Sequence, residues 1–244
     1  MDSGYYAACA GFAAQSQALE LVAHNLANLG TTGYRGQQAT FRSLVAGGAS
    51  VSRNALNAAV NNYGVLGGSR VDLSPGSTVA TGNSHDLSIA GAGFFTVQTA
   101  QGVLYTRSGS FHITSNGKMV TPEGDAVLGE RGPVSVPNGA FAVSSDGTIS
   151  VDGAIVDQLR LAEFSHDTNL TAAGNSLYSA PPNSALPPVN SSVRQGMLEN
   201  SNVSPVLAVV DMISVQRNAD LLAHAMSVFD SQFNQTAVQD LPRV

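Results

Sequence analysis

The fold of this chain is decided by residues 205–235, PVLAVVDMISVQRNADLLAHAMSVFDSQFNQ. Apolar residues recur there at alternating intervals of four and three, at Ala208, Met212, Val215, Ala219, Leu222, Met226, Phe229 and Phe233. This spacing returns each apolar side chain to one stripe of a helix and is typical of a coiled-coil seam. Ser204 can cap the helix and Pro205 suits its first position, so a long helix is predicted from there to about residue 235.

The N-terminal stretch repeats the same spacing with one polar interruption. Its members are Tyr5, Ala8, Phe12, Gln15, Leu19, Val22, Leu26 and Leu29. A helix over about 4–29 is therefore predicted, ended by Gly30 and Gly33. Two seams of equal period at opposite ends of the chain indicate that the terminal helices pair.

The C-terminal helix carries a second apolar stripe. Val206, Val209, Val210 and Ile213 lie away from the seam. A helix that is apolar on more than one face must be buried on more than one side. Physics alone leaves two explanations equally open: assembly of several subunits through the terminal helices, or packing onto the chain's own central domain.

The middle of the chain predicts β-structure. Residues 36–80 are rich in Gly, Ser and Asn and suggest an extended linker with little regular structure. From Thr81 onward short apolar segments alternate with turn signals, among them Asn116-Gly117, Asp146-Gly147 and Asp152-Gly153. We expect an α+β protein with an N-terminal helix in 1–35, a linker in 36–80, a mainly antiparallel β-domain in 81–190, and a C-terminal segment and helix in 191–244. The two helical parts would form one discontinuous coiled-coil domain.

Composition excludes several classes of protein. Charged residues make up 11% of the chain, against roughly 25% in typical soluble domains. The net charge of −6 and the single lysine, Lys118, argue against a nucleic-acid partner. No run approaches the roughly 18 apolar residues of a membrane span, and no cationic, apolar leader opens the sequence, so neither membrane insertion nor a cleavable signal peptide is expected.

Signatures of catalysis are weak. Cys9 is the only cysteine, and the five histidines show no metal-ligand spacing. Gly91-Ala92-Gly93 resembles the start of a dinucleotide loop, but Phe94-Phe95 follows and no helix is predicted there, so a bend where two strands pass closely is favoured. We therefore expect no enzyme activity, no cofactor and no metal.

Three segments resemble the rod and hook proteins of the bacterial flagellum. The first is residues 24–35, HNLANLGTTGYR, in which His24 and Tyr34 replace the usual Asn and Phe. The second is 81–97, TGNSHDLSIAGAGFFTV, followed by 105–111, YTRSGSF. The third is 196–203, GMLENSNV, followed by Met212-Ile213 and Gln216-Arg217. All three stand in the family's order and together extend over nearly the whole chain.

The resemblance implies an axial structural protein. Its terminal helices would form the inner layer of a helical tube, with the β-domain outside, and its partners would be other rod and hook proteins. Such proteins are exported unfolded by the flagellar type III apparatus without a cleaved leader, to the rod in the periplasmic space. A tube also supplies the neighbours that the second stripe demands, which favours assembly over packing onto the chain's own domain.

The seams and the matched motifs supply the candidate subunit contacts. They are Phe12, Leu19, Val22, Asn25, Leu26, Asn28, Leu29, Gly33, Leu198, Glu199, Asn202, Val203, Met212, Val215, Gln216, Leu222, Met226 and Phe229. For the Asn and Glu residues in this set, a cap or turn bond within one subunit is an equal alternative.

Chain length and residues 129–139, leading to 146–150, favour a proximal rod subunit. The intact Gly93-Phe94-Phe95 and Gln216-Arg217 are nearer to the distal rod pattern, which is the alternative. A secreted β-domain that binds a glycan or a host protein, with the helices as an oligomerisation stalk, is the alternative from another class. The absence of tryptophan counts against it. A hydrolase is the third and weakest reading.

Overall fold

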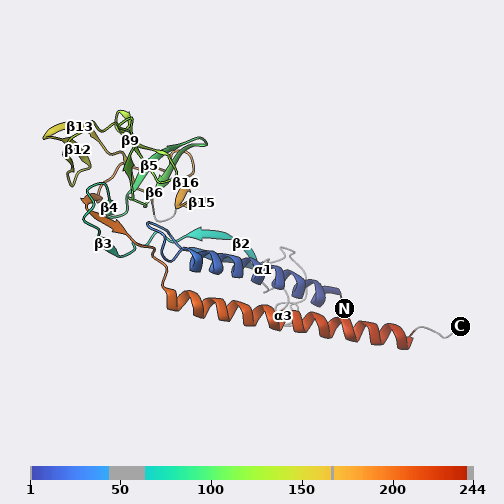
Figure 1. Cartoon of the computed structure of the whole chain (residues 1–244). Helices are drawn as coiled ribbons and strands as arrows, with labels where there is room; N and C mark the ends of the chain where they lie inside the picture. The colour runs from blue at the N-terminus through green and yellow to red at the C-terminus, as the bar shows by residue number, and fades with distance from the viewer. Residues whose placement is uncertain (1, 44–63, 166–167, 241–244) are drawn as a thin grey trace. The chain divides into compact units, whose positions relative to one another are not determined.

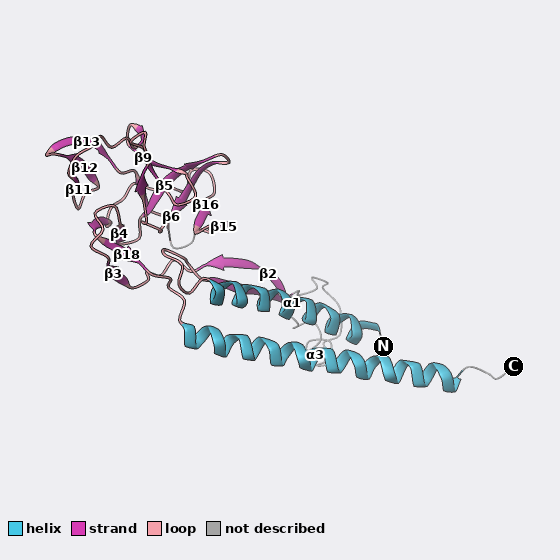
Figure 2. Ribbon diagram, viewed as in Figure 1, coloured by secondary structure: helices cyan, strands magenta, loops and turns pink. Residues whose placement is uncertain are grey.

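The computed structural model describes residues 2–43, 64–165 and 168–240 and divides the chain into two compact units (Figure 1). The helical unit takes residues 1–26, 37–69 and 205–244. The β unit takes residues 27–36 and 70–204. The helices belong to the first unit and most strands to the second, as the secondary-structure colouring makes plain (Figure 2), so the α+β class is confirmed.

Two helices form the body of the helical unit. They are α1, Asp2–Ala27, and α3, Pro205–Asp240. The helices run side by side in opposite directions (Figure 1), and the Cys9 thiol lies 3.6 Å from the Met226 sulfur. The predicted start of the second helix at Pro205 is confirmed, with Ser204 directly before it.

The seam of α3 is the less exposed side of that helix. Ala208 is buried, and the seam positions from Met212 to Met226 are half-buried. On α1 the seam residues Phe12 and Leu19 are half-buried, whereas small side chains such as Ala14 and Ala18 are fully buried. Tyr5 and Phe233 lie outside the residues whose side chains the structure describes. That the paired helices supercoil stays a prediction.

The expected linker over 36–80 contains strands in its described part. β1, Gln37–Ser43, and β2, Gly64–Val71, pair as a two-stranded sheet, and β3, Thr78–Ala80, pairs elsewhere. The prediction of little regular structure was wrong here. In β2, glycines at 64, 67 and 68 interrupt the alternation of apolar and polar residues that indicates a strand. The strand still forms because pairing with β1 supplies its backbone hydrogen bonds. Residues 44–63 lie outside the described residues.

The β unit is built around one large sheet with strand order β15-β16-β6-β5-β9-β8-β7, to which β10 and β14 add. The bounds are β5 Phe94–Thr99, β6 Gly102–Thr106, β7 His112–Ile113, β8 Met119–Val120, β9 Ala126–Gly129, β10 Gly132–Pro133, β14 Leu161–Ala162, β15 Thr171–Gly174 and β16 Leu177–Ser179. Each described pairing is antiparallel, as predicted. The core beneath it is apolar and includes Phe95, Val97 and Val127.

Three smaller sheets complete the β unit. They pair β11 Phe141–Val143 with β12 Thr148–Val151 and β13 Ala154–Gln158, β17 Ser192–Gln195 with β4 Leu87–Ala90, and β18 Met197–Glu199 with β3. The predicted turns at Asp146-Gly147 and Asp152-Gly153 join β11 to β12 and β12 to β13, and the one at Asn116-Gly117 joins β7 to β8 in the large sheet. Asp152 and Gly153 have φ of 50° and 83°, which only a few residue types adopt without strain.

The C-terminal segment before α3 belongs to the β unit. The sequence placed residues 191–204 with the coiled-coil domain, but β17 and β18 within it pair with β4 and β3. Residues 27–36, expected in the helical domain, likewise belong to the β unit. Sequence periodicity could not show this, because the bonds that decide it join segments more than 100 residues apart.

Candidate functional site

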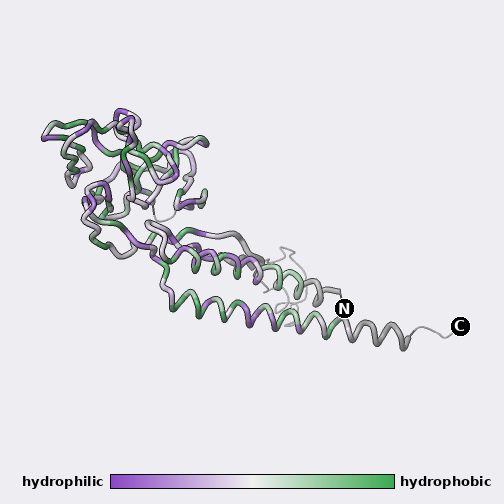
Figure 3. The backbone as a smooth tube through the Cα atoms, viewed as in Figure 1, coloured by the Kyte–Doolittle hydropathy of each residue, from purple (hydrophilic) through white to green (hydrophobic). Residues whose placement is uncertain are grey.

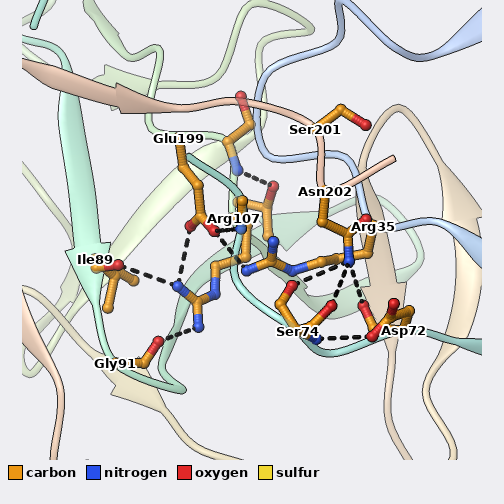
Figure 4. A network of polar contacts seen from close by, with 12 residues as sticks. Arg35, Asp72, Ser74, Ile89, Gly91, Arg107, Glu199, Ser201 and Asn202 are labelled. Atoms are coloured by element: carbon orange, nitrogen blue, oxygen red, sulfur yellow. Dashed lines mark hydrogen bonds and ion pairs between the residues drawn. The ribbon is translucent and has the colours of Figure 1, made fainter. Parts of the chain in front are cut away.

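A buried ionic junction of three side chains lies in the β unit (Figure 4). The Arg35 Nη2 atom is 2.7 Å from one Glu199 carboxylate oxygen, and the Arg107 Nη1 atom is 3.0 Å from the other. Arg35 is 0% exposed, and Arg107 and Glu199 are each 1% exposed. One carboxylate therefore bridges two cations that have no access to solvent.

The junction gathers segments from the whole length of the chain. Arg35 follows the turn after α1, Arg107 follows β6, and Glu199 ends β18. Each residue comes from a different one of the three segments that resemble the flagellar family. The Gly76 N–H donates a further hydrogen bond to the Glu199 carboxylate at 2.8 Å. The junction thus ties the two chain ends of the β unit to its central sheet.

Arg107 makes most of its polar contacts with backbone. Its guanidinium donates to the Ile89 carbonyl at 3.1 Å and the Gly91 carbonyl at 2.5 Å, and it lies 5.0 Å from the centre of the Phe94 ring. Burial lowers the pKa of Arg107 to about 10, although the nearby Glu199 opposes that shift. The guanidinium is still charged at neutral pH, and Glu199 is the carboxylate that forms an ion pair with it.

Hydrogen bonds also hold the backbone at and just before Arg35. The Arg35 N–H donates to the Tyr178 hydroxyl at 2.7 Å. Burial raises the pKa of Tyr178 to about 12, which keeps its phenol protonated under physiological conditions. Two residues earlier, the Gly33 N–H donates to the Glu199 backbone carbonyl at 2.7 Å.

Position 33 requires glycine for two reasons, its backbone conformation and the lack of room for a side chain. Its φ is +66°, in the left-handed region that favours glycine. A Cβ atom placed there would lie 2.2 Å from the Ser108 backbone nitrogen. The turn of the N-terminal motif therefore passes directly against the backbone that follows Arg107.

Removing one member of the junction is expected to lower the stability of the fold strongly. Breaking a buried ion pair by removing one partner costs about 3–5 kcal/mol, because the other charge stays buried without compensation. Here the loss of Glu199 would leave two cations in that state. Among the described residues, no acceptor is bonded to Arg35 Nε, Arg35 Nη1 or Arg107 Nε, so these buried donors have no partner besides the contacts already named for each guanidinium.

Two asparagines from the candidate list act as backbone clamps. The Asn202 carbonyl oxygen accepts from the Gly36 N–H at 2.7 Å, and its amide donates to the carbonyls of Asp72 and Ser74 at 3.1 and 3.0 Å (Figure 4). The Asn25 amide forms two hydrogen bonds with the backbone of Gln37, at 2.7 and 2.9 Å. Asn28 bonds to the Thr31 hydroxyl at 3.1 Å. These contacts lie within one chain.

The structure separates the remaining candidate residues by exposure. Most of the remaining candidates are half-buried apolar residues: Phe12, Leu19, Val22, Leu26, Leu29, Leu198, Val203, Met212, Val215, Leu222 and Met226. Gln216 and Phe229 are exposed. Contact of any of these residues with another subunit stays a prediction.

Sequence reasoning missed the junction as a unit. Arg35 and Arg107 stood inside the quoted motifs, but neither was singled out. The only signal was that this charge-poor chain places Arg35, Arg107 and Glu199 in three different motifs, and nothing in the sequence singled these three out from Asp86 and Arg217 in the same motifs.

The second apolar stripe of α3 is exposed in the structure of the single chain. Val206 is 72%, Val210 52%, Ile213 46% and Leu221 68% exposed. The hydropathy colouring of the backbone shows apolar residues recurring along α3 (Figure 3). We call Val206, Val210, Ile213, Arg217 and Leu221 the outer stripe. Large apolar side chains exposed in a row on one helix face are typical of protein–protein or membrane interaction surfaces.

The described residues offer little for other chemistry. They hold no group of three or more His, Cys, Asp or Glu placed to share a metal ion, and no described helix is long and apolar enough to cross a membrane. The bend predicted at Gly91–Gly93 is confirmed as a close approach: a Cβ on Gly91 would lie 2.2 Å from the Asn190 carbonyl oxygen.

Three family models match the chain. Residues 6–35 match the flagella basal body rod protein model, residues 88–151 the flagellar hook protein FlgE/F/G D1 domain, and residues 194–237 the flagellar basal body rod FlgEFG protein C-terminal model. The three matches contain Arg35, Arg107 and Glu199 respectively. The junction therefore joins the three regions that the family models describe.

Individual relatives match over nearly their full length. The chain is 30% identical to the flagellar basal-body rod protein FlgG of Agrobacterium fabrum, over 91% of this chain and 94% of the relative. It is 29% identical to FlgF of Caulobacter vibrioides, over 100% of both chains. It is 30% identical to FlgF of Escherichia coli, over 94% and 95%.

Proposed function

The chain belongs to the family of flagellar basal-body rod proteins, and on this basis we propose that it is a structural subunit of the flagellar rod. Its terminal helices pack against those of neighbouring subunits and transmit torque along the drive shaft. The work is mechanical and no substrate is converted. Family membership also supports a place in the basal body and assembly with other rod and hook proteins.

The outer stripe of α3 is the observation that carries this proposal. The helical unit has a seam between its own helices and, beside it, apolar side chains that α1 does not cover. Burying apolar surface contributes about 25 cal/mol per Å², so a line of exposed valine, isoleucine and leucine strongly favours association. A helical tube of subunits would cover this line along the whole helix.

We favour the proximal rod protein, FlgF, over the distal rod protein, FlgG. Collinear similarity to FlgF of Caulobacter vibrioides over the whole of both chains supports this choice, as do residues 129–139 and 146–150. Similarity to FlgG is equally strong in identity, so the distal role is the alternative. We further propose export through the flagellar type III apparatus and a position in the periplasmic part of the rod.

Deletion and complementation test the proposal. Cells of the source bacterium without the gene should not swim, and the full chain should restore swimming and be found in isolated basal bodies. A chain that ends at residue 204 should keep the β unit yet restore neither. Normal swimming with that truncated chain would refute assembly through α3.

The same strain separates the two rod positions. Without a proximal subunit, basal bodies should lack all distal rod protein and end near the inner membrane. If the deletion strain instead retains a proximal rod and lacks only its outer part, the chain is the distal subunit.

A further inference from the structure

One cation interrupts the apolar outer stripe of α3. Arg217 follows Ile213 by four residues and precedes Leu221 by four, so it lies on the same helix face. It is exposed, and within the described part of the chain no ion pair joins it to a carboxylate. A surface that covers this stripe must therefore receive a guanidinium in its middle.

A buried cation needs a counter-charge on the covering surface. Moving an unpaired charge out of water costs several kcal/mol, which would offset the gain from the flanking apolar residues. A partner that merely offered apolar side chains would be rejected. The complementary surface has to combine a carboxylate with room for the long arginine side chain.

The helical unit itself contains such a surface on α1. A cleft of about 680 Å³ is lined by Gln17, Glu20, Leu21 and His24 of α1 and by Gln37, Gly68 and Ser69 of the β1–β2 pair. Glu20 is the carboxylate in this lining, and its side chain is exposed. No ion pair to Glu20 is present among the described residues.

Glu20 and Arg217 do not satisfy each other within one chain. Both lie in the helical unit and both are described, but they are not joined. The α3 seam is its half-buried side, whereas Arg217 stands with the exposed valines and isoleucine of another face. The two charges are therefore free to be matched by a second copy.

We propose that Arg217 of one copy enters the α1 cleft of a second copy and pairs there with Glu20. The inference rests on the proposed function, since it assumes that the outer stripe is an assembly surface. The apolar residues on either side of Arg217 would lie along the rim of the cleft, and the ion pair would fix the register between the copies.

Charge reversal tests the pair in full-length chains expressed in the deletion strain. Glu20→Arg alone and Arg217→Glu alone should each reduce the amount of chain in isolated basal bodies by about tenfold or more, because like charges would meet in the interface. The double variant should restore incorporation. Glu123→Arg, a charge change in an exposed turn of the β unit, serves as the control and should incorporate normally.

Co-expression of the two single variants distinguishes a pair between copies from one within a chain. Arg217 of the first variant can meet Glu20 of the second, and the reversed charges can meet each other, so incorporation should recover in the mixture. Recovery with the double variant but not with the mixture would place the pair within one chain and overturn the proposal. Failure of both rescues would also overturn it.

Two controls keep the test decisive. Glu20→Gln and Arg217→Gln remove the charge without repulsion and should lower incorporation several-fold, even if a reversal variant fails to fold. Single variants that incorporate like the unmodified chain would overturn the pair but leave the rod function intact. Absence of the unmodified chain from basal bodies would refute the rod function itself.

Discussion

The ionic junction of the β unit buries charged side chains, whereas the outer stripe of α3 exposes apolar ones. In the junction, Arg35, Arg107 and Glu199 are withdrawn from water and matched within the chain. On the stripe, apolar side chains such as Val206 and Val210 remain in water. The first region is complete in a single subunit, whereas the proposed function requires the second to be covered on assembly.

This contrast assigns different roles to residues of one family signature. The segment 196–203 supplies Glu199 and Asn202, both bonded inside the β unit. A few residues later the signature continues into α3, where Arg217 faces outward. Motif membership therefore does not by itself mark a subunit contact, and burial separates residues that hold the fold from those that can meet a neighbour.

The largest effect should come from where the chain is cut. A chain of residues 1–204 keeps β17, β18 and Glu199, whereas residues 1–190 lose them and leave β3 and β4 without partners. We expect a cooperative urea transition for the first chain and none for the second, measured by circular dichroism. A cooperative transition of equal midpoint in the shorter chain would show that the junction is dispensable.

Removal of the bridging Glu199 carboxylate should have the next largest effect on stability. Glu199→Gln leaves Arg35 and Arg107 buried without a counter-charge, so the free energy of unfolding should fall by about 3–5 kcal/mol. Urea denaturation of the full chain measures it. Glu163→Gln is the matched control, since Glu163 is only partly buried and accepts from Ser191 and Asn190, and its cost should be about 1 kcal/mol. Equal losses in both variants would contradict the account.

The turn at Gly33 provides a test of the close approach. Gly33→Ala should lower the free energy of unfolding by about 2–5 kcal/mol, from backbone strain and from the clash with Ser108. Gly153→Ala has the same strain, with φ of +83°, but open space around its Cβ, and should cost about 1–2 kcal/mol. The difference between the stability losses of the two variants measures the clash with Ser108. Equal losses would argue against the close approach of Gly33 to the Ser108 backbone.

A smaller effect is expected at the backbone of Arg35. Tyr178→Phe removes the acceptor of the buried Arg35 N–H and should cost about 1–3 kcal/mol in thermal or urea unfolding. Tyr105→Phe, in the neighbouring strand β6, removes a hydroxyl from a half-buried site and should change stability by less than about 0.5 kcal/mol. The reverse order of the two effects would contradict the assigned hydrogen bond.

Local patterns in the sequence were sufficient for the helices, the turns and the second stripe. The start at Pro205, the hairpins at Asn116-Gly117 and Asp152-Gly153 and the presence of a second apolar stripe on α3 all depend on residues within one or two turns of each other. Such features follow from helix period, capping and the tolerance for positive φ.

The junction and the unit boundaries could not be predicted in the same way. Arg35 and Glu199 are 164 positions apart, and nothing local indicates that they meet. The pairing of β17 with β4 likewise depends on contacts across the whole chain. The three motifs were recognisable as family signatures, but only the folded structure shows that their charged residues share one buried site.

The most direct test of the contrast is a double substitution on the outer stripe, Val210→Ser with Ile213→Ser. Serine has nearly the helix propensity of both residues, and the side chains are exposed, so the free energy of unfolding should change by no more than about 0.5 kcal/mol.

The decisive measurement is the amount of this variant in isolated basal bodies beside its stability in solution. We predict a subunit as stable as the unmodified chain that is not incorporated and does not restore swimming. Normal incorporation, or a loss of more than about 2 kcal/mol of stability in the free subunit, would show that the stripe is not a surface left open for assembly.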